Sequence, residues 1–67
     1  MKYIVELINE LKGMDEVGVA ERFHLPSLDV AHHRRLDFDN WLRRCVEPSR
    51  TFGSLDEAWA LYDKSFG

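Results

Sequence analysis

The chain has 67 residues, of which 45% are hydrophobic and 31% charged, a balance typical of a soluble globular protein and too apolar for a disordered one. This length allows one small core, so we expect a single helical domain over residues 1–67. The net charge of −3 argues against broad neutralisation of nucleic acid phosphates, although the six arginines all fall within residues 20–50.

Cys45 is the sole cysteine, which excludes a disulfide within the chain and favours a reducing cytoplasm. Glu6 and Glu10 interrupt the first apolar run too early for a signal peptide or a membrane span. We therefore expect a cytoplasmic protein without a membrane partner.

Two short amphipathic helices are predicted in the first third of the chain. Apolar residues at steps of three and four predict a helix over residues 3–11 that stops near Gly13. Asp15 is a suitable cap for a second helix, with Val17, Ala20 and Phe23 facing inward, and Pro26 ends it.

The middle of the chain is less regular. Ser27 would cap a further turn or two through residues 28–35, but an ordered loop fits equally well because His32-His33-Arg34-Arg35 has no apolar repeat. A helix over residues 36–46 is clearer. Its inward stripe holds Phe38, Trp41, Leu42 and Cys45, and its arginines Arg43 and Arg44 turn outward.

The last helix is predicted to begin at Ser54, after a break containing proline and glycine. Ser54 and Glu57 form an S-x-x-E capping box, in which Glu57 accepts from the amide of Ser54. No segment alternates long enough for a strand. The pattern thus predicts an all-α bundle of four or five short helices, with a core of Ile4, Leu7, Ile8, Leu11, Val17, Ala20, Phe23, Trp41, Leu42, Leu55, Trp59 and Tyr62.

Residues capable of chemistry are present but poorly spaced. The three histidines and Cys45 lack the separations of a metal site, and Cys45 shares a stripe with core residues. Pairs of acids such as Asp56 and Glu57 stand at helix starts, where capping explains them. We expect no catalytic residues, no metal and no cofactor, and hence a protein that is not an enzyme.

One alternative is a DNA-binding regulator with a helix-turn-helix over residues 16–35. Ala20 then faces a second helix across a turn, and phosphates or base edges are reached by Ser27, His32, Arg34 and Arg35. Against this, His24 stands where the turn usually has glycine, and His33 where an aliphatic residue is expected.

The last helix carries a family resemblance. Leu55-Asp56-Glu57-Ala58-Trp59-Ala60-Leu61-Tyr62 resembles the F-D-E-A-W-x-x-Y signature at the C-terminus of the YozE family, small bacterial proteins of SAM-like helical fold. Trp41-Leu42 falls where that family has Tyr-Leu, and Asp15-Glu16-Val17-Gly18 with Ala20 resembles its D-x-I-G-x-x-A helix start. The resemblance spans about residues 15–63 and implies a SAM-like bundle, with no established reaction.

We therefore predict a small interaction module or regulator, of bacterial or phage origin, that binds an unidentified protein partner. The predicted contact residues suit an acidic surface and are Arg34, Arg35, Arg43 and Arg44. A monomer and a weak homodimer are both compatible with so small a bundle.

Overall fold

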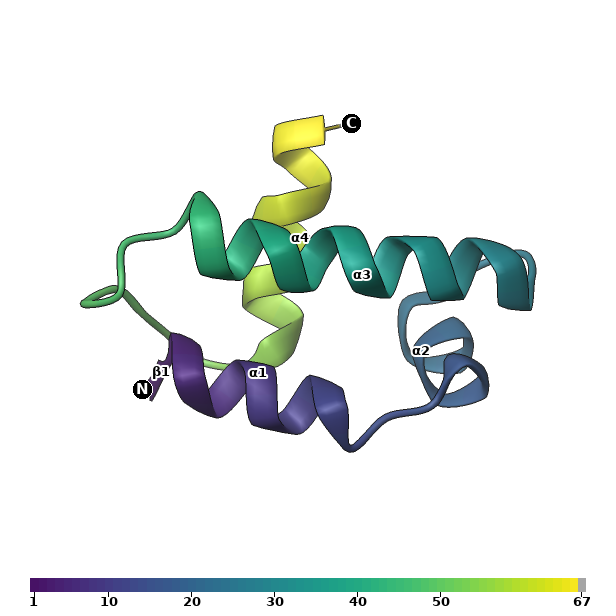
Figure 1. Ribbon diagram of the computed structural model, residues 1–67, viewed down its shortest axis with the longest axis horizontal. Coiled ribbons are helices and arrows are strands. Elements are labelled where there is room, and N and C mark those ends of the chain that lie inside the picture. The colour runs from purple at the N-terminus through teal and green to yellow at the C-terminus, as the bar shows by residue number, and fades with distance from the viewer. Residues whose placement is uncertain (67) are drawn as a thin grey trace.

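The computed structural model describes residues 1–66, with the side chains of residues 1–65. Four helices and a two-stranded ladder make up the fold (Figure 1). The elements are β1 (Lys2–Tyr3), α1 (Ile4–Lys12), α2 (Glu16–Phe23), α3 (Leu28–Arg44), β2 (Thr51–Phe52) and α4 (Leu55–Phe66). The predicted all-α bundle is thus confirmed, with four helices.

The longest element is α3, which is one helix of 17 residues. The loop considered for residues 27–35 is wrong, because this segment forms the first half of α3. Ser27 caps it, its hydroxyl accepting from the amide of Val30 at 3.2 Å. This half of the helix buries the small side chain of Ala31, so the sequence shows little apolar repeat there.

The absence of strands was also a wrong expectation. Lys2 pairs with Phe52 and Tyr3 with Thr51 in an antiparallel ladder of two residues per strand. Strands this short have no alternation for a sequence pattern to reveal. The ladder fastens the start of the chain to the segment before α4.

The start of α2 is capped as predicted, with the carboxylate of Asp15 accepting from the amide of Gly18 at 2.8 Å. Its inward face is not the predicted one. Val17, which was predicted to face inward, is 49% exposed, whereas Val19 is fully buried. Val19 and Phe23 lie one turn apart, so they face the core together. The helix ends at Phe23, before Pro26, with His24 in the left-handed conformation (φ 56°, ψ 48°).

Half of the predicted capping box at α4 is present as expected. The amide of Glu57 donates to the Ser54 hydroxyl at 3.3 Å. The Glu57 carboxylate accepts from Gly53, at 2.7 Å, and not from Ser54 as predicted. The acid therefore holds the residue before the cap and fixes the entry of the chain into α4.

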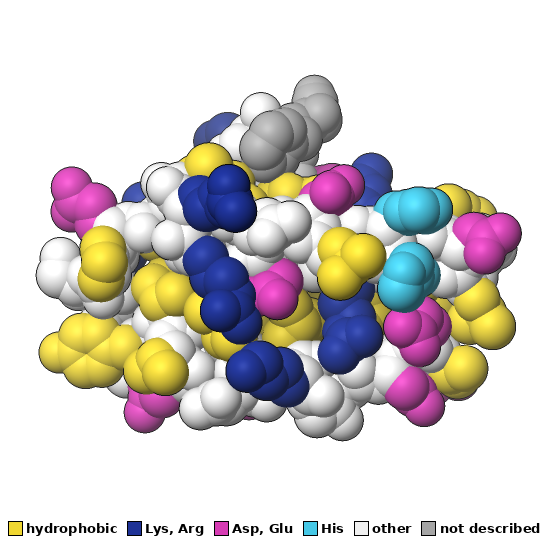
Figure 2. Space-filling model, in the orientation of Figure 1, with side chains coloured by type: hydrophobic (Ala, Val, Ile, Leu, Met, Phe, Trp, Pro, Cys, Tyr) yellow, Lys and Arg dark blue, Asp and Glu magenta, His cyan; other side chains and the backbone are white. Residues whose placement is uncertain are grey.

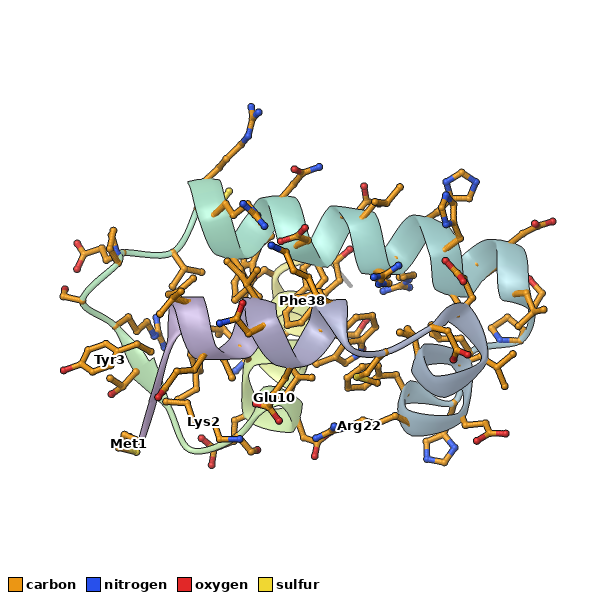
Figure 3. The ribbon with its side chains drawn as sticks, turned by 60° about the horizontal axis from the view of Figure 1, so that its bottom comes forward. Met1, Lys2, Tyr3, Glu10, Arg22 and Phe38 are labelled. Carbon is orange, nitrogen blue, oxygen red and sulfur yellow. The ribbon has the colours of Figure 1, made fainter. Side chains whose placement is uncertain are left out.

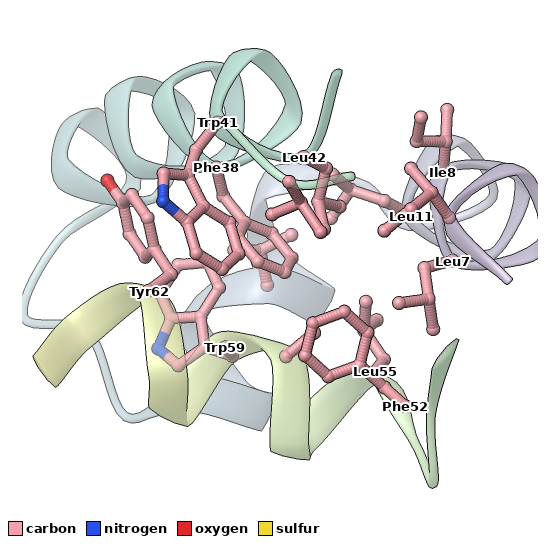
Figure 4. Close-up of a cluster of buried hydrophobic side chains, with 14 of the residues drawn as sticks. Leu7, Ile8, Leu11, Phe38, Trp41, Leu42, Phe52, Leu55, Trp59 and Tyr62 are labelled. Carbon is pink, nitrogen blue, oxygen red and sulfur yellow. The ribbon is translucent and has the colours of Figure 1, made fainter. Parts of the chain in front are cut away.

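The core has an aliphatic half where α1 meets α3 and an aromatic half where α4 crosses α3 (Figure 4). The predicted core is confirmed at its α1, α3 and α4 positions, while Ala20 and Phe23 pack against it partly buried. Cys45, expected in the stripe of α3, is exposed at the end of that helix. Buried residues that the predicted core lacked are Val19, Ala31, Phe38, Val46, Phe52 and Ala58.

Charged contacts join helices at the surface. Arg22 of α2 makes two hydrogen bonds to the Asp56 carboxylate at the start of α4, at 3.0 and 3.1 Å. Lys2 of β1 contacts Glu10 of α1 at 2.8 Å, and Lys2, Glu10 and Arg22 lie on the side of the molecule shown in Figure 3. Within residues 1–66, no helix has the length and apolar character to cross a membrane.

Candidate functional site

The four arginines predicted to bind a partner all lie on α3, but they do not share one face. Arg34 and Arg43 are nine positions apart, as are Arg35 and Arg44. Nine residues are about two and a half turns of helix, so the members of each pair project to opposite sides. The structure therefore divides these residues between two surfaces.

Two of these arginines, Arg34 and Arg35, contact an acidic residue of another helix. Arg34 contacts Asp63 of α4 at 3.0 Å, and Arg35 contacts Glu16 of α2 at 3.5 Å. Both contacts link α3 to another helix.

The remaining two arginines differ from each other. Arg43 contacts Asp39 at 2.7 Å, one turn earlier on α3. Arg44 makes no ion pair with any side chain of residues 1–65. Of the four, Arg44 keeps its full charge available to a ligand.

Arg34 and Arg44 line the same depression, which we call the α3–α4 groove. Its volume is about 650 Å³. Trp41 and Tyr62 form an aromatic part of its wall, with ring centroids 5.6 Å apart in an edge-on arrangement. Burial raises the pKa of the Tyr62 hydroxyl above its usual value of 10.0, and the charge of Asp37 adds to this. The full lining is Val30, His33, Arg34, Asp37, Asn40, Trp41, Arg44, Cys45 and Tyr62.

The groove is long and carries more positive than negative charge. Arg34 and Arg44 are ten positions apart on α3, which corresponds to about 15 Å along the helix axis. Asp37 is the acid of the lining, against two arginines and His33. An apolar centre between two cations is suited to an elongated acidic ligand.

The residues of the DNA-binding alternative are brought together only in part. Residues 24–27 form a tight turn between α2 and α3, and His24 has the backbone conformation for which glycine is usual there. Ser27 serves as the cap of α3. Arg34 lies toward α4, where it contacts Asp63.

Glu16 lies among the basic residues that the DNA-binding alternative would use. The carboxylate of Glu16 lies 3.2 Å from the Nδ1 atom of His32 and 3.5 Å from the Arg35 guanidinium. The hydrogen bond with His32, aided by the charge of Arg35, holds the pKa of Glu16 below its ordinary value of 4.5. Both basic side chains are therefore directed to a carboxylate of their own chain.

No cluster of metal ligands is found in the part of the chain that the structure describes. Groups of three or more His, Cys, Asp or Glu side chains placed to hold an ion are absent from residues 1–66. His32 and His33 lie with ring centroids 5.7 Å apart, and Cys45 is on the wall of the α3–α4 groove.

A second depression, the α1–α3 groove, has a volume of about 490 Å³ and was not predicted from the sequence. It lies on the side of α3 from which Arg43 projects, about half a turn around the helix from Arg34. The signal available in the sequence was Val5, an apolar residue outside the inward stripe of α1. The lining is Tyr3, Ile4, Val5, Ile8, Asn9, Lys12, Leu42, Arg43, Val46 and Pro48.

Comparisons with known proteins add no assignment: no family model, no curated protein and no solved structure matches the chain. The two grooves and the turn between α2 and α3 are thus the features from which a function is inferred.

Proposed function

We propose that this chain is a non-enzymatic interaction module that binds an acidic segment of a partner protein in the α3–α4 groove. The observation that carries the proposal is the position of Arg44, a cation that makes no ion pair with a described side chain, beside the aromatic wall of Trp41 and Tyr62. Trp, Tyr and Arg are the residue types in which the energetic hot spots of protein interfaces are enriched.

The shape of the groove supports a protein segment as the ligand. An extended peptide covers about 3.3 Å per residue, so roughly five residues would span the distance of about 15 Å between Arg34 and Arg44. Acidic side chains at the two ends of such a segment would meet the arginines, and an apolar residue between them would cover Trp41. Arg34 already forms an ion pair with Asp63, so Arg44 provides the larger part of the charge recognition.

The test is a titration with fluorescent peptides of about seven residues, carrying acids at both ends and an aromatic residue at the centre. We expect Arg44→Glu to weaken binding about tenfold or more, since a reversed charge repels the peptide. Lys64→Glu is the matched control, because Lys64 is an exposed cation of α4 outside the grooves. Equal loss with both variants, or none with Arg44→Glu, contradicts the proposal.

The α2–turn–α3 arrangement favours one second candidate, a DNA-binding regulator using residues 16–35. The position of Glu16 beside His32 and Arg35 weighs against it. Duplex DNA titrated at two salt concentrations decides the matter. Micromolar binding with a steep salt dependence supports DNA recognition, and no binding at low salt removes it.

Membership of the YozE family, a SAM-like arrangement of the helices, a bacterial or phage origin and a cytoplasmic location stay predictions. The same holds for the choice between monomer and weak homodimer, which sedimentation over a range of concentrations resolves.

A further inference from the structure

Exposed hydrophobic side chains stand at the rim of the α1–α3 groove. Tyr3 is 54% exposed and Val5 63%, and both line the groove. In Figure 3 the ring of Tyr3 points outward, away from Phe38 in the core. Clustered exposed hydrophobic side chains mark interaction sites, whereas single ones need no explanation.

The bottom of this groove is continuous with the core. Ile8, Leu42 and Val46 are buried or nearly so, yet all three line the groove. Figure 2 shows hydrophobic side chains gathered on the face that α1 and α3 present, with a file of Lys and Arg side chains bordering them. An occupant would thus cover exposed residues at the rim and complete the packing of the aliphatic half of the core.

The two walls are helices, which favours a helical occupant. α1 and α3 lie side by side in Figure 1 and contact each other. A third helix fits between two neighbouring helices by placing its side chains in the grooves of both. The lining extends from Tyr3 to Lys12, about 13 Å along α1, so an occupant of about three turns would fill it.

The charges of the groove select the occupant. Lys12 and Arg43 belong to its lining, and no carboxylate does. Lys12 makes no ion pair with a described side chain, whereas Arg43 forms an ion pair with Asp39. This cationic edge is unusual in a chain of net charge −3. It complements a helix that has acids beside its apolar face.

We infer that the α1–α3 groove docks an acidic amphipathic helix of a partner protein. This surface is separate from the α3–α4 groove, since the two lie on opposite sides of α3 and share no residue. The apolar face of the helix covers Val5, Ile8 and Val46, and its acids meet Lys12 and Arg43.

The probe is a synthetic amphipathic peptide of about four turns with leucines on one face and glutamates beside them, paired with a twin that has lysines in place of the glutamates. Binding is followed by fluorescence anisotropy and mapped by amide chemical shifts. We expect the acidic peptide to bind and to shift the amides of Ile8, Leu42 and Val46. The lysine twin should bind about tenfold or more weakly.

Val5→Asp and Lys12→Glu should each weaken the acidic peptide about tenfold or more. Val17→Asp is the matched control, because Val17 is also an exposed valine at the second position of a helix and lines neither groove. An acid in the first turn favours the helix, so Val5→Asp should fold. Arg44→Glu should leave this affinity unchanged, which separates the inference from the function proposed above.

Several results would overturn the inference. These are equal binding of both peptides, no binding of the acidic peptide at low salt, or full affinity in Val5→Asp. A dimer seen by sedimentation that Val5→Asp dissociates would assign the groove to a second copy of the chain. Binding to phosphatidylglycerol vesicles that Val5→Asp abolishes, without binding of the peptide, would assign it to a lipid surface.

Discussion

Phe23 and Trp59 stack face to face, with ring centroids 4.0 Å apart and ring planes 9° from parallel. The stack joins α2 to α4, and the contact of Arg22 with Asp56 lies beside it. Trp59 also meets Phe38 edge-on at 4.9 Å, so one ring connects three helices. The short helix α2 is therefore held from two sides, by α3 and by α4.

Replacing Phe23 with alanine should lower the free energy of unfolding by about 2 kcal/mol, somewhat less than for a fully buried phenylalanine because Phe23 is partly exposed. The loss comes from the stack with Trp59 and from the area that both rings bury. Urea denaturation measures it. Val17→Ala, on the exposed side of the same helix, should change stability little, and an equal loss in both variants would contradict this account.

Trp59→Ala should unfold the protein or abolish its cooperative melting. Removing a buried tryptophan costs about 3–5 kcal/mol, a large share of the roughly 5–15 kcal/mol that holds a domain folded. Thermal melting followed by circular dichroism shows the outcome. A folded variant with a cooperative transition near that of the native chain would mean that the aromatic half of the core is not essential.

His24→Gly should stabilise the chain by about 0.5–1 kcal/mol. The left-handed backbone of His24 costs a side chain with a Cβ atom more than it costs glycine. His24→Val should destabilise, since a β-branched residue fits this conformation worst. Melting temperatures in the order Gly, His, Val are expected, and a Val variant as stable as the Gly variant would exclude backbone strain as the cause.

Gly53→Ala should destabilise the chain by about 1 kcal/mol, comparable to loss of a helix cap. A Cβ atom at this position would lie 2.8 and 2.9 Å from the two carboxylate oxygens of Glu57 and would displace them from the Gly53 amide. In a Glu57→Ala background the same change should cost almost nothing. A double-mutant cycle by urea denaturation tests this, and additive losses would contradict it.

Glu16→Gln should reduce the loss of stability in acid. The pKa of Glu16 is lowered in the folded chain, so its contribution is present above the ordinary value of 4.5 and is lost as the pH falls through the folded value. Free energies of unfolding, measured above pH 4.5 and below the folded pKa, show the difference between the native chain and Glu16→Gln. Glu21→Gln, on the exposed side of α2, is the matched control for the loss of one carboxylate from this helix. His32→Ala should bring the NMR-titrated pKa of Glu16 toward its ordinary value.

Much of the helical architecture could be predicted because its signals are local. The spacing of Ile4, Leu7 and Leu11 and the caps at Asp15 and Ser54 each involve neighbours within one helix. The first half of α3 stayed undecided between a short helix and a loop because its main buried residue is alanine, whose small side chain gives a weak apolar signal. The β1–β2 ladder escaped prediction because its partners are remote in the sequence and its strands too short to alternate.

The candidate site could be predicted less well than the fold. The arginines were found by their clustering in the sequence, but their division between two sides of α3 depends on the helix being continuous. Ion pairs such as Arg34 with Asp63 and Arg35 with Glu16 join separate helices and leave no trace in local spacing. The α1–α3 groove depends on how far apart two helices pack, which residue patterns do not encode.

The β1–β2 ladder also has a kinetic consequence. Its two strands are separated by three helices, so forming it means closing a long loop, which slows folding more than it affects stability. We expect the ladder to form after α1 has packed on α3 and to be among the first contacts to open. Because Tyr3 belongs to both β1 and the α1–α3 groove, each opening would dismantle one rim of that groove. An occupant would therefore slow hydrogen exchange of the ladder amides, at a distance from its own acidic contacts.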